Sequence, residues 1–310
     1  MDQTISALII SARPRQWLKN LSLLTGLVFT GWLFLPEKLA TALWAVFIFS
    51  LITSSVYIFN DIIDAPHDRL HPLKKNRPIA SGVLSIPLAL FAAIILASIS
   101  MYLSLETSFF FFILGLLYIG LHFAYTLWLK HIPIVDVMAI ASGFIIRVYA
   151  GAVAIDAHIN VWLLLCIVSF SLFLAIGKRR SEKTLLQARA PNSQRQVLSH
   201  YPENLLGIYT AMFANTTWLT YALFTFQQPT FINHSSMLTL MADLPRAFIN
   251  QKLLMLTVPF VIYGVMRYLQ LIYDQDKGES PEEVLLTDIP LLIDIGVWGF
   301  LIIFIIYGIA

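Results

Sequence analysis

The chain has 310 residues, of which 58% are hydrophobic and only 12% are charged. With a mean hydropathy of +0.76, this composition is far more apolar than that of a soluble globular domain and excludes one. The net charge of +2 carries little information by itself, and no nucleic-acid partner is expected. The only cysteine, Cys166, excludes an internal disulfide and any cysteine-based metal site.

The long apolar runs predict an all-α, polytopic membrane protein that forms one domain over residues 1–310. Helices are expected because backbone in contact with lipid must satisfy its own hydrogen bonds. In chain order, the nine predicted transmembrane helices cover about residues 18–36, 40–62, 86–105, 107–129, 134–155, 160–177, 205–228, 253–273 and 290–309.

The distribution of basic residues predicts the orientation in the membrane. With a cytoplasmic N-terminus, Lys and Arg fall in the N-terminal segment, in cytoplasmic loops or at cytoplasmic helix ends, except for Lys38, Arg147, Arg246 and Lys252. The positive-inside rule therefore predicts an N-terminus in the cytoplasm and a C-terminus outside. We expect a protein of the cytoplasmic (inner) membrane whose charged clusters, and with them the active site, face the cytoplasm.

The segment Asn60-Asp61-Ile62-Ile63-Asp64-Ala65-Pro66-His67-Asp68 ends the second predicted span. Asp61, Asp64 and Asp68 stand at i, i+3 and i+7, on one helical face, where they repel one another unless a hard cation lies between them. A Mg²⁺ site that bridges a diphosphate is the favoured interpretation, because Mg²⁺ completes its octahedron with water and phosphate oxygens. A solvated, charged helix end is the alternative. Pro66 predicts that the helix ends or kinks near Asp64.

Two charged residues lie within the fifth predicted span. Asp136 and Arg147 share a helical face but are separated by about 16 Å of helical rise, too far to pair directly. Asp136 lies near the cytoplasmic end, and a charge within a span is functional by default. For Arg147 we favour a structural role, either capping carbonyl groups or extending towards the outer surface.

Several short motifs occur in a characteristic order along the chain. They are Arg13-Pro14-Arg15-Gln16-Trp17-Leu18-Lys19-Asn20, Asn60-Asp61-x-x-Asp64-x-x-x-Asp68, His71-Pro72-Leu73-Lys74, Arg77-Pro78-Ile79-Ala80-Ser81-Gly82, Gly177-Lys178-Arg179 and Ser280-Pro281-Glu282-Glu283. Together they resemble the UbiA prenyltransferase superfamily, and within it the decaprenyl-phosphate phosphoribosyltransferase branch. The resemblance runs from about Arg13 to the last span. Each string alone is weak, whereas their order and spacing together are specific.

The resemblance implies a nine-helix UbiA-like bundle around a cavity that opens to the cytoplasm and to lipid. Mg²⁺ and a diphosphate would bind there. The donor of this branch is 5-phosphoribosyl 1-diphosphate and the acceptor is a polyprenyl phosphate. Aromatic prenyltransferases of the superfamily carry a second acid-rich motif after the sixth span, whereas the matching position here is the basic Gly177-Lys178-Arg179-Arg180-Ser181-Glu182. Their Tyr-x-x-x-Lys element is replaced by Tyr125-Thr126-Leu127-Trp128-Leu129-Lys130, as the phosphoribosyl branch has it.

This assignment implies a role for each candidate site residue. Asp61, Asp64 and Asp68 would hold the metal, while Asn60 would orient a carboxylate or a ribose hydroxyl. Asp136 would hold ribose hydroxyls or a lysine. Tyr125 would bond a phosphate, with a membrane-interface aromatic as the alternative. Donor and acceptor bring three anionic centres, so basic side chains must bind them. The candidates are Lys19, Lys74, Arg77, Lys130, Lys178 and Arg179, each of which is alternatively a positive-inside topology charge.

Two other functions stay open at this point. An intramembrane prenyltransferase that uses a prenyl diphosphate and a small aromatic acceptor shares the first acidic motif, but predicts a second one that the sequence lacks. A lipid-phosphate binder or transporter predicts polar residues along a path through the bilayer, whereas here they stop on the cytoplasmic side. The sequence leaves open the polyprenyl chain length, the downstream pathway, the number of Mg²⁺ ions and the oligomeric state.

Overall fold

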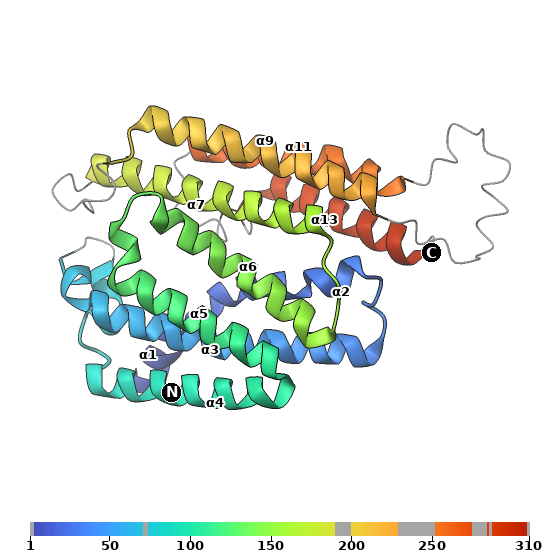
Figure 1. Ribbon diagram of the computed structural model, residues 1–310. Coiled ribbons are helices and arrows are strands. Elements are labelled where there is room, and N and C mark those ends of the chain that lie inside the picture. Colours follow the sequence, from blue (N-terminus) through green and yellow to red (C-terminus); the bar gives the residue numbers. More distant parts are fainter. Residues whose placement is uncertain are drawn as a thin grey trace, which may run out of the picture. The chain divides into compact units, whose positions relative to one another are not determined.

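A computed structural model describes residues 3–70, 74–189, 200–228, 252–274, 284 and 287–308 (Figure 1). All regular elements in this part of the chain are helices, which confirms the all-α prediction. The chain divides into two compact units. The first comprises the described residues of 1–27, 35–157 and 186–201, and the second those of 28–34, 158–185 and 202–310. One domain over the whole chain stays a prediction.

The first unit is built around the long helix α3. Its elements are α1 (Gln3–Ala12), η1 (Pro14–Leu24), α3 (Pro36–Asp68), η2 (Lys74–Asn76), α4 (Ile86–Thr107), α5 (Phe109–Leu127), η3 (Leu129–His131) and α6 (Val135–Ile155). Helix α3 packs against α1, η1, α4, α5 and α6. The short helix α2 (Thr25–Phe29) crosses the boundary between the units.

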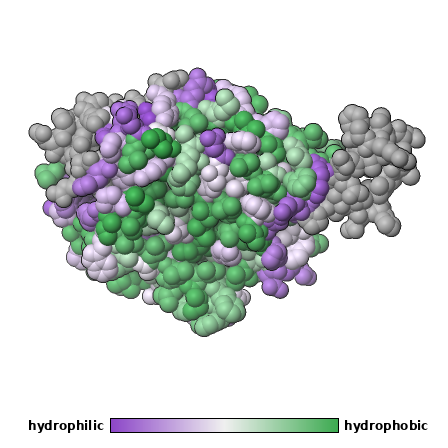
Figure 2. Space-filling model, turned by 45° about the horizontal axis from the view of Figure 1, so that its top comes forward, coloured by the Kyte–Doolittle hydropathy of each residue, from purple (hydrophilic) through white to green (hydrophobic). Residues whose placement is uncertain are grey.

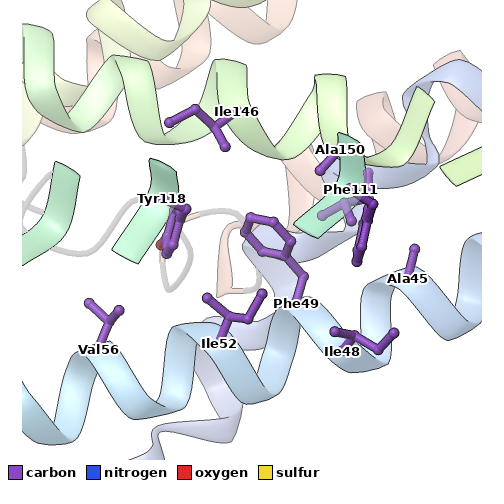
Figure 3. Close-up of a cluster of buried hydrophobic side chains, with 10 residues drawn as sticks. Ala45, Ile48, Phe49, Ile52, Val56, Phe111, Tyr118, Ile146 and Ala150 are labelled. Carbon is purple, nitrogen blue, oxygen red and sulfur yellow. The ribbon is translucent and has the colours of Figure 1, made fainter. Parts of the chain in front are cut away.

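The hydrophobic core of the first unit lies between α3, α5 and α6 (Figure 3). Phe49 of α3 is fully buried and makes edge contacts with Phe111 and Tyr118 of α5, at centroid distances of 6.4 and 4.9 Å. Ile146 of α6 closes the cluster from the other side. Removing a buried ring such as Phe49 costs about 3–5 kcal/mol, so this core fixes the position of the α3 end that carries the acidic motif.

The second unit contains α7 (Val161–Arg189) up to Leu185, α9 (Glu203–Gln227), η6 (Leu253–Thr257), α11 (Val258–Asp274), α13 (Ile289–Ile303) and the π-helical turn η7 (Phe304–Gly308). Its core joins residues of α7, α9, α11 and α13. Phe173 and Tyr268 meet edge to face with centroids 5.3 Å apart. Tyr221, Thr257 and Trp298 form a hydrogen-bonded group, in which Trp298 Nε1 donates to Tyr221 Oη at 3.0 Å.

Seven of the described helices are long and apolar enough to cross a membrane. They are α3, α4, α5, α6, the 161–184 part of α7, the pair η6–α11 and the pair α13–η7. Large apolar side chains on them, such as Phe91, Phe110 and Phe300, are more than 60% exposed, and hydrophobic residues cover much of the face shown in Figure 2. Exposed apolar surface of this kind is expected where helices contact lipid. The protein is an integral membrane protein.

Two predicted spans are not among these seven, so the count of nine stays a prediction. The segment 18–36 is not one continuous α-helix, since η1 is a 3₁₀ helix followed by the short α2. Its polar side chains explain the difference: Trp17 donates to Ser54, and Asn20 to Ser50 and Thr53, so bonds to α3 fix this segment. The segment 205–228 is the helix α9, whose threonines and asparagine lower its hydropathy.

Candidate active site

The acidic motif lies on the last three turns of α3. This helix continues without interruption to Asp68, with Pro66 in its last turn. The prediction that the helix ends near Asp64 is therefore wrong, whereas the alternative of a kink there stays a prediction. A proline so close to the helix end removes one backbone hydrogen bond, but the residues that follow it can stay helical. The ion pairs described next help to hold these residues in place.

Asp61 and Asp68 are joined by arginines. The Nη1 atom of Arg77 lies 3.1 Å from Asp61 Oδ1 and 2.6 Å from Asp68 Oδ2. Arg13 Nη2 lies 2.5 Å from the same Oδ1 of Asp61. Both carboxylates are buried, at 3% and 5% exposure. One guanidinium nitrogen thus occupies a position between two carboxylates that is also suited to a divalent cation.

Asp64 has a different set of partners. Lys130 Nζ lies 2.6 Å from its Oδ1, and Asn60 Nδ2 donates to its Oδ2 at 3.1 Å. Asn60 Oδ1 in turn accepts a hydrogen bond from Thr126 Oγ1 at 3.0 Å. Asn60 thus contacts a carboxylate, while its predicted role in orienting a carboxylate or a ribose hydroxyl stays a prediction. The contact also links the end of α3 to the end of α5 and to Lys130 in η3.

A compact turn after η2 positions Arg77. The amide of Ser81 donates to Arg77 O, and the amide of Leu84 donates to Pro78 O. Gly82 closes the turn with a φ of 82°, a conformation that L-residues with a side chain rarely adopt. The Arg77-Pro78-Ile79-Ala80-Ser81-Gly82 string is thus a folding motif that aims one arginine at α3.

Arg13 is a site residue that sequence reasoning did not select, although it belongs to a motif quoted above. It connects α1 to η1 with a φ of 54°, and its guanidinium also lies 5.2 Å from the centre of the Tyr57 ring. A non-glycine residue in this region of backbone space is uncommon and is frequently found at functional sites. The motif was the available signal, but the contact between residues 13 and 61 depends on the path of η1.

The donor set of the acidic motif fits magnesium, although its geometry is that of ion pairs. Among the described residues, no three His, Cys, Asp or Glu side chains are gathered as ready ligands for one ion, because cationic side chains stand between the aspartates. Mg²⁺ takes only one or two carboxylates and fills its other positions with water and phosphate oxygens. The pair Asp61 and Asp68, with Asp64 beside them, meets that need.

The remaining four predicted residues of the first unit lie on four different elements. Lys19 is in η1, Lys74 in η2 and Tyr125 in α5, each partly exposed. Asp136 lies in the first turn of α6, fully buried, and its Oδ1 accepts a hydrogen bond from Tyr201 Oη at 2.6 Å. Tyr201 Oη also accepts from the Ile134 amide. These contacts make Asp136 a partner of Tyr201, and its predicted role towards ribose stays a prediction.

Lys178 and Arg179 belong to the second unit. They lie within α7, which continues as a helix to Arg189, beyond the predicted end of the sixth span at about residue 177. Arg179 is 1% exposed and its Nη1 lies 2.7 Å from Glu182 Oε2, three residues further on. This i,i+3 pair supports the helix beyond the apolar span. Lys178 is partly exposed.

Arg147 takes neither of the two forms of structural role predicted for it in the described part of the chain. It is 4% exposed, and the hydrogen bonds that it donates there go to the side chains of Asn20 and Tyr118. The residues 71–73 and the motif Ser280-Pro281-Glu282-Glu283 lie outside the described residues.

The chain matches the model of the UbiA prenyltransferase family over residues 21–285. A decaprenyl-phosphate phosphoribosyltransferase of Mycolicibacterium smegmatis is 34% identical over 288 residues, which cover 92% of this chain and 87% of that protein. The enzyme of the same name from Corynebacterium glutamicum is 32% identical over 305 residues, covering 97% and 86%.

Solved structures agree on the fold. A UbiA homolog from Archaeoglobus fulgidus, bound to GPP and Mg²⁺, is similar with a TM-score of 0.70 at 17% identity, covering 97% of this chain and 99% of that one. The family match spans most of the chain, and the two relatives exceed 30% identity over nearly their whole length. The chain therefore belongs to the UbiA prenyltransferase family.

Proposed function

We propose that this protein is a membrane glycosyltransferase that moves the 5-phosphoribosyl group from 5-phosphoribosyl 1-diphosphate to a polyprenyl phosphate of the decaprenyl type, with release of diphosphate. The observation that carries this proposal is the ion-pair group of Asp61, Asp64 and Asp68 with Arg13, Arg77 and Lys130. It stands in a chain whose relatives are named decaprenyl-phosphate phosphoribosyltransferase. Acids that suit Mg²⁺ and bases that suit phosphate meet in one place.

Asp61, Asp64 and Asp68 would hold Mg²⁺. When bound, the metal neutralises charge that develops on the departing diphosphate. The three cations that contact these aspartates, Arg13, Arg77 and Lys130, would then bind oxygens of the diphosphate. We expect Arg13 and Arg77 to grip two oxygens each, because a guanidinium matches phosphate in a bidentate manner, while Lys130 acts as a point charge.

The chemistry needs no strong base from the protein. As the bond between ribose C1 and the diphosphate oxygen breaks, the ribosyl centre becomes oxocarbenium-like, and a phosphate oxygen of the lipid forms the new bond from the opposite face. That phosphate monoester, with a second pKa of about 6, is already largely ionised at neutral pH. An α-configured donor therefore gives a β-linked product by a single inversion.

The proposal includes the orientation of the protein in the membrane and the side from which each substrate reaches the active site. The N-terminus is cytoplasmic, the C-terminus is outside, and the aspartate group faces the cytoplasm, where a soluble phosphorylated donor is available. The lipid acceptor enters from the membrane.

A second candidate is prenyl transfer to an aromatic acceptor, because the Archaeoglobus structures of the same fold were solved with GPP or DMAPP and Mg²⁺. The sequence argues against it, since the position of the second acidic motif carries Lys178 and Arg179.

The test is a transfer assay with purified protein in lipid. With 5-phosphoribosyl 1-diphosphate labelled in the ribose, Mg²⁺ and polyprenyl phosphates of several lengths, we expect label to enter the lipid fraction only when both substrates and the metal are present. Failure of every polyprenyl phosphate to accept label would refute the proposal. Parallel reactions with geranyl diphosphate and 4-hydroxybenzoate test the second candidate.

A further inference from the structure

We propose that Arg147, with Lys19 and His122, forms a binding site for a phosphate monoester in the interior of the first unit. The inference rests on the proposed function and adds a second anion site to it, apart from the aspartates. Two phosphates of the reaction have this chemistry: the 5-phosphate of the donor and the phosphate of the lipid acceptor.

Arg147 is a buried cation held by neutral groups. Its Nε donates to Asn20 Oδ1 at 3.0 Å and its Nη2 to Tyr118 Oη at 2.6 Å. The guanidinium carbon lies 5.0 Å from the centre of the Tyr118 ring and 5.1 Å from that of Phe144. These contacts fix the orientation of the guanidinium, and in the described part of the chain they leave its Nη1 available as a donor.

The charge of Arg147 has no counter-charge in the described part of the chain, where its hydrogen bonds go to an amide and a phenol. A charge removed from water is normally retained only where an opposite charge or a metal compensates it. Intramembrane arginines are accordingly associated with substrate sites. The compensating group is therefore expected to come from a bound anion.

His122 supplies a second, independent observation. Its Nε2 is buried and has no hydrogen-bond partner among the described residues, and it points towards Gly143 of α6, where an added Cβ would lie 3.0 Å from it. The ring of His122 packs on Tyr118, the same residue that binds Arg147, with centroids 4.3 Å apart. Lys19 precedes Asn20, the partner of Arg147, in η1. The three nitrogen-bearing side chains of the proposed site thus come from η1, α5 and α6.

The position of this group separates it from the metal ligands. Tyr118 precedes Thr126, the partner of Asn60, by eight residues of α5, which is about 12 Å of helical rise. Asn20 likewise contacts Ser50 and Thr53 of α3, well before Asp61. A ligand whose diphosphate lies at the aspartates would therefore present a different phosphate, or its acceptor, to Arg147.

The experiment measures the contribution of each phosphate to binding. Dissociation constants are determined for purified protein with Mg²⁺ and four ligands: 5-phosphoribosyl 1-diphosphate, ribose 1-diphosphate, farnesyl phosphate and farnesol. The ligands form two pairs that differ by one phosphate: 5-phosphoribosyl 1-diphosphate with ribose 1-diphosphate, and farnesyl phosphate with farnesol. Within each pair, the ratio of the two dissociation constants gives the contribution of that phosphate to binding. For Arg147→Gln, we expect this ratio to fall about ten- to hundredfold in one pair only, because charge-assisted bonds are lost. The affected pair identifies the phosphate. Lys38→Gln is the matched control, because Lys38 lies at the start of α3 and donates to the backbone carbonyl of Ile155 at the end of α6, and it should leave both ratios unchanged.

Equal weakening of both members of each pair by Arg147→Gln would show a purely structural role and overturn the inference. Unchanged ratios in a folded variant would overturn it as well. If Arg147→Gln does not fold, Lys19→Gln must lower the ratio of one pair. Unchanged ratios in that variant would equally overturn the inference. If the wild-type protein transfers the ribosyl group and the variants keep both ratios, this inference alone is overturned. If the wild-type protein transfers no ribosyl group, the proposed function is overturned too.

Discussion

At the scale of single residues, ion pairs hold the candidate site together: Arg77 Nη1 lies between Asp61 and Asp68, and Lys130 pairs with Asp64. The sequence, with its family resemblance, predicts these five residues as site residues. Their assignment as metal and phosphate ligands stays a prediction. Spacing could not show that Asp64 faces Lys130 while Asp61 faces two arginines, because these partners come from loops whose path depends on tertiary packing.

The metal proposal predicts a large effect of neutralising one carboxylate. Asp64→Asn keeps the shape of the side chain and removes the charge, so we expect turnover to fall about a hundred- to a thousandfold with little change in membrane insertion. Chelation of Mg²⁺ by EDTA should reproduce the loss in the wild type. The matched control is Asp156→Asn, at the exposed end of α6 in the same unit, which should be nearly silent. Near-normal turnover of Asp64→Asn would remove the metal proposal.

Lys178 tests the role of the basic run in α7. If it binds a substrate phosphate, Lys178→Gln should raise the KM for the ribosyl donor or the lipid phosphate about tenfold or more, with kcat nearly unchanged, because one charge-assisted bond is lost. Steady-state kinetics with each substrate varied in turn gives the answer. Lys75→Gln, at an exposed position next to η2 residue Lys74, is the control. Unchanged KM values would show that Lys178 binds no substrate phosphate and is a positive-inside topology charge.

At the scale of elements, long apolar runs predicted helices well. The structure has α4, α5 and α6 within a few residues of the predicted spans. The sequence could not show that 18–36 begins as a 3₁₀ helix, because that conformation depends on bonds from Trp17 and Asn20 to α3. It also could not show that α7 runs beyond the apolar span, since a charged helix end and a charged loop have similar composition.

Close contact between η1 and α6 gives a prediction for one glycine. A Cβ added to Gly151 would lie 1.9 Å from the carbonyl oxygen of Leu23, so Gly151→Ala must push η1 away from α6. We expect a loss of about 1–3 kcal/mol in stability and reduced turnover, because η1 carries Lys19 and follows Arg13. Thermal unfolding in detergent measures the first and the transfer assay the second.

Gly120→Ala is the control for this change. Gly120 also lies in a helix, but no atom stands within 4 Å of an added Cβ. Replacing it should be neutral or stabilise the helix by up to about 1 kcal/mol. Equal behaviour of the two variants would contradict the close packing of η1 on α6.

At the scale of the whole molecule, the composition was sufficient for a membrane protein, and the motif order was sufficient for the family. Composition was not sufficient for the number of spans, because a helix such as α9 carries polar as well as apolar side chains and lies between a membrane span and a soluble helix in hydropathy. The orientation depends on loop charges alone. Helix α3, with 33 residues, is about 50 Å long, longer than the hydrocarbon core is thick.

The ends of α3 should therefore lie on opposite sides of the membrane. In a Cys166→Ser background, Glu37→Cys near the start of α3 should react with an impermeant maleimide from outside, and Lys75→Cys after its end should react only from the cytoplasmic side. Both positions are exposed. Labelling of both from one side would contradict the span, and a reversed pattern would contradict the orientation.

A competition experiment tests the central claim most directly. Purified protein in lipid receives 5-phosphoribosyl 1-diphosphate, geranyl diphosphate, decaprenyl phosphate and 4-hydroxybenzoate together with Mg²⁺, and the products are identified by mass spectrometry. The proposed function predicts a phosphoribosylated decaprenyl phosphate, with a β-linkage from the α-configured donor, and its loss in Asp64→Asn. A geranylated aromatic product, with no ribosyl lipid formed, would contradict it.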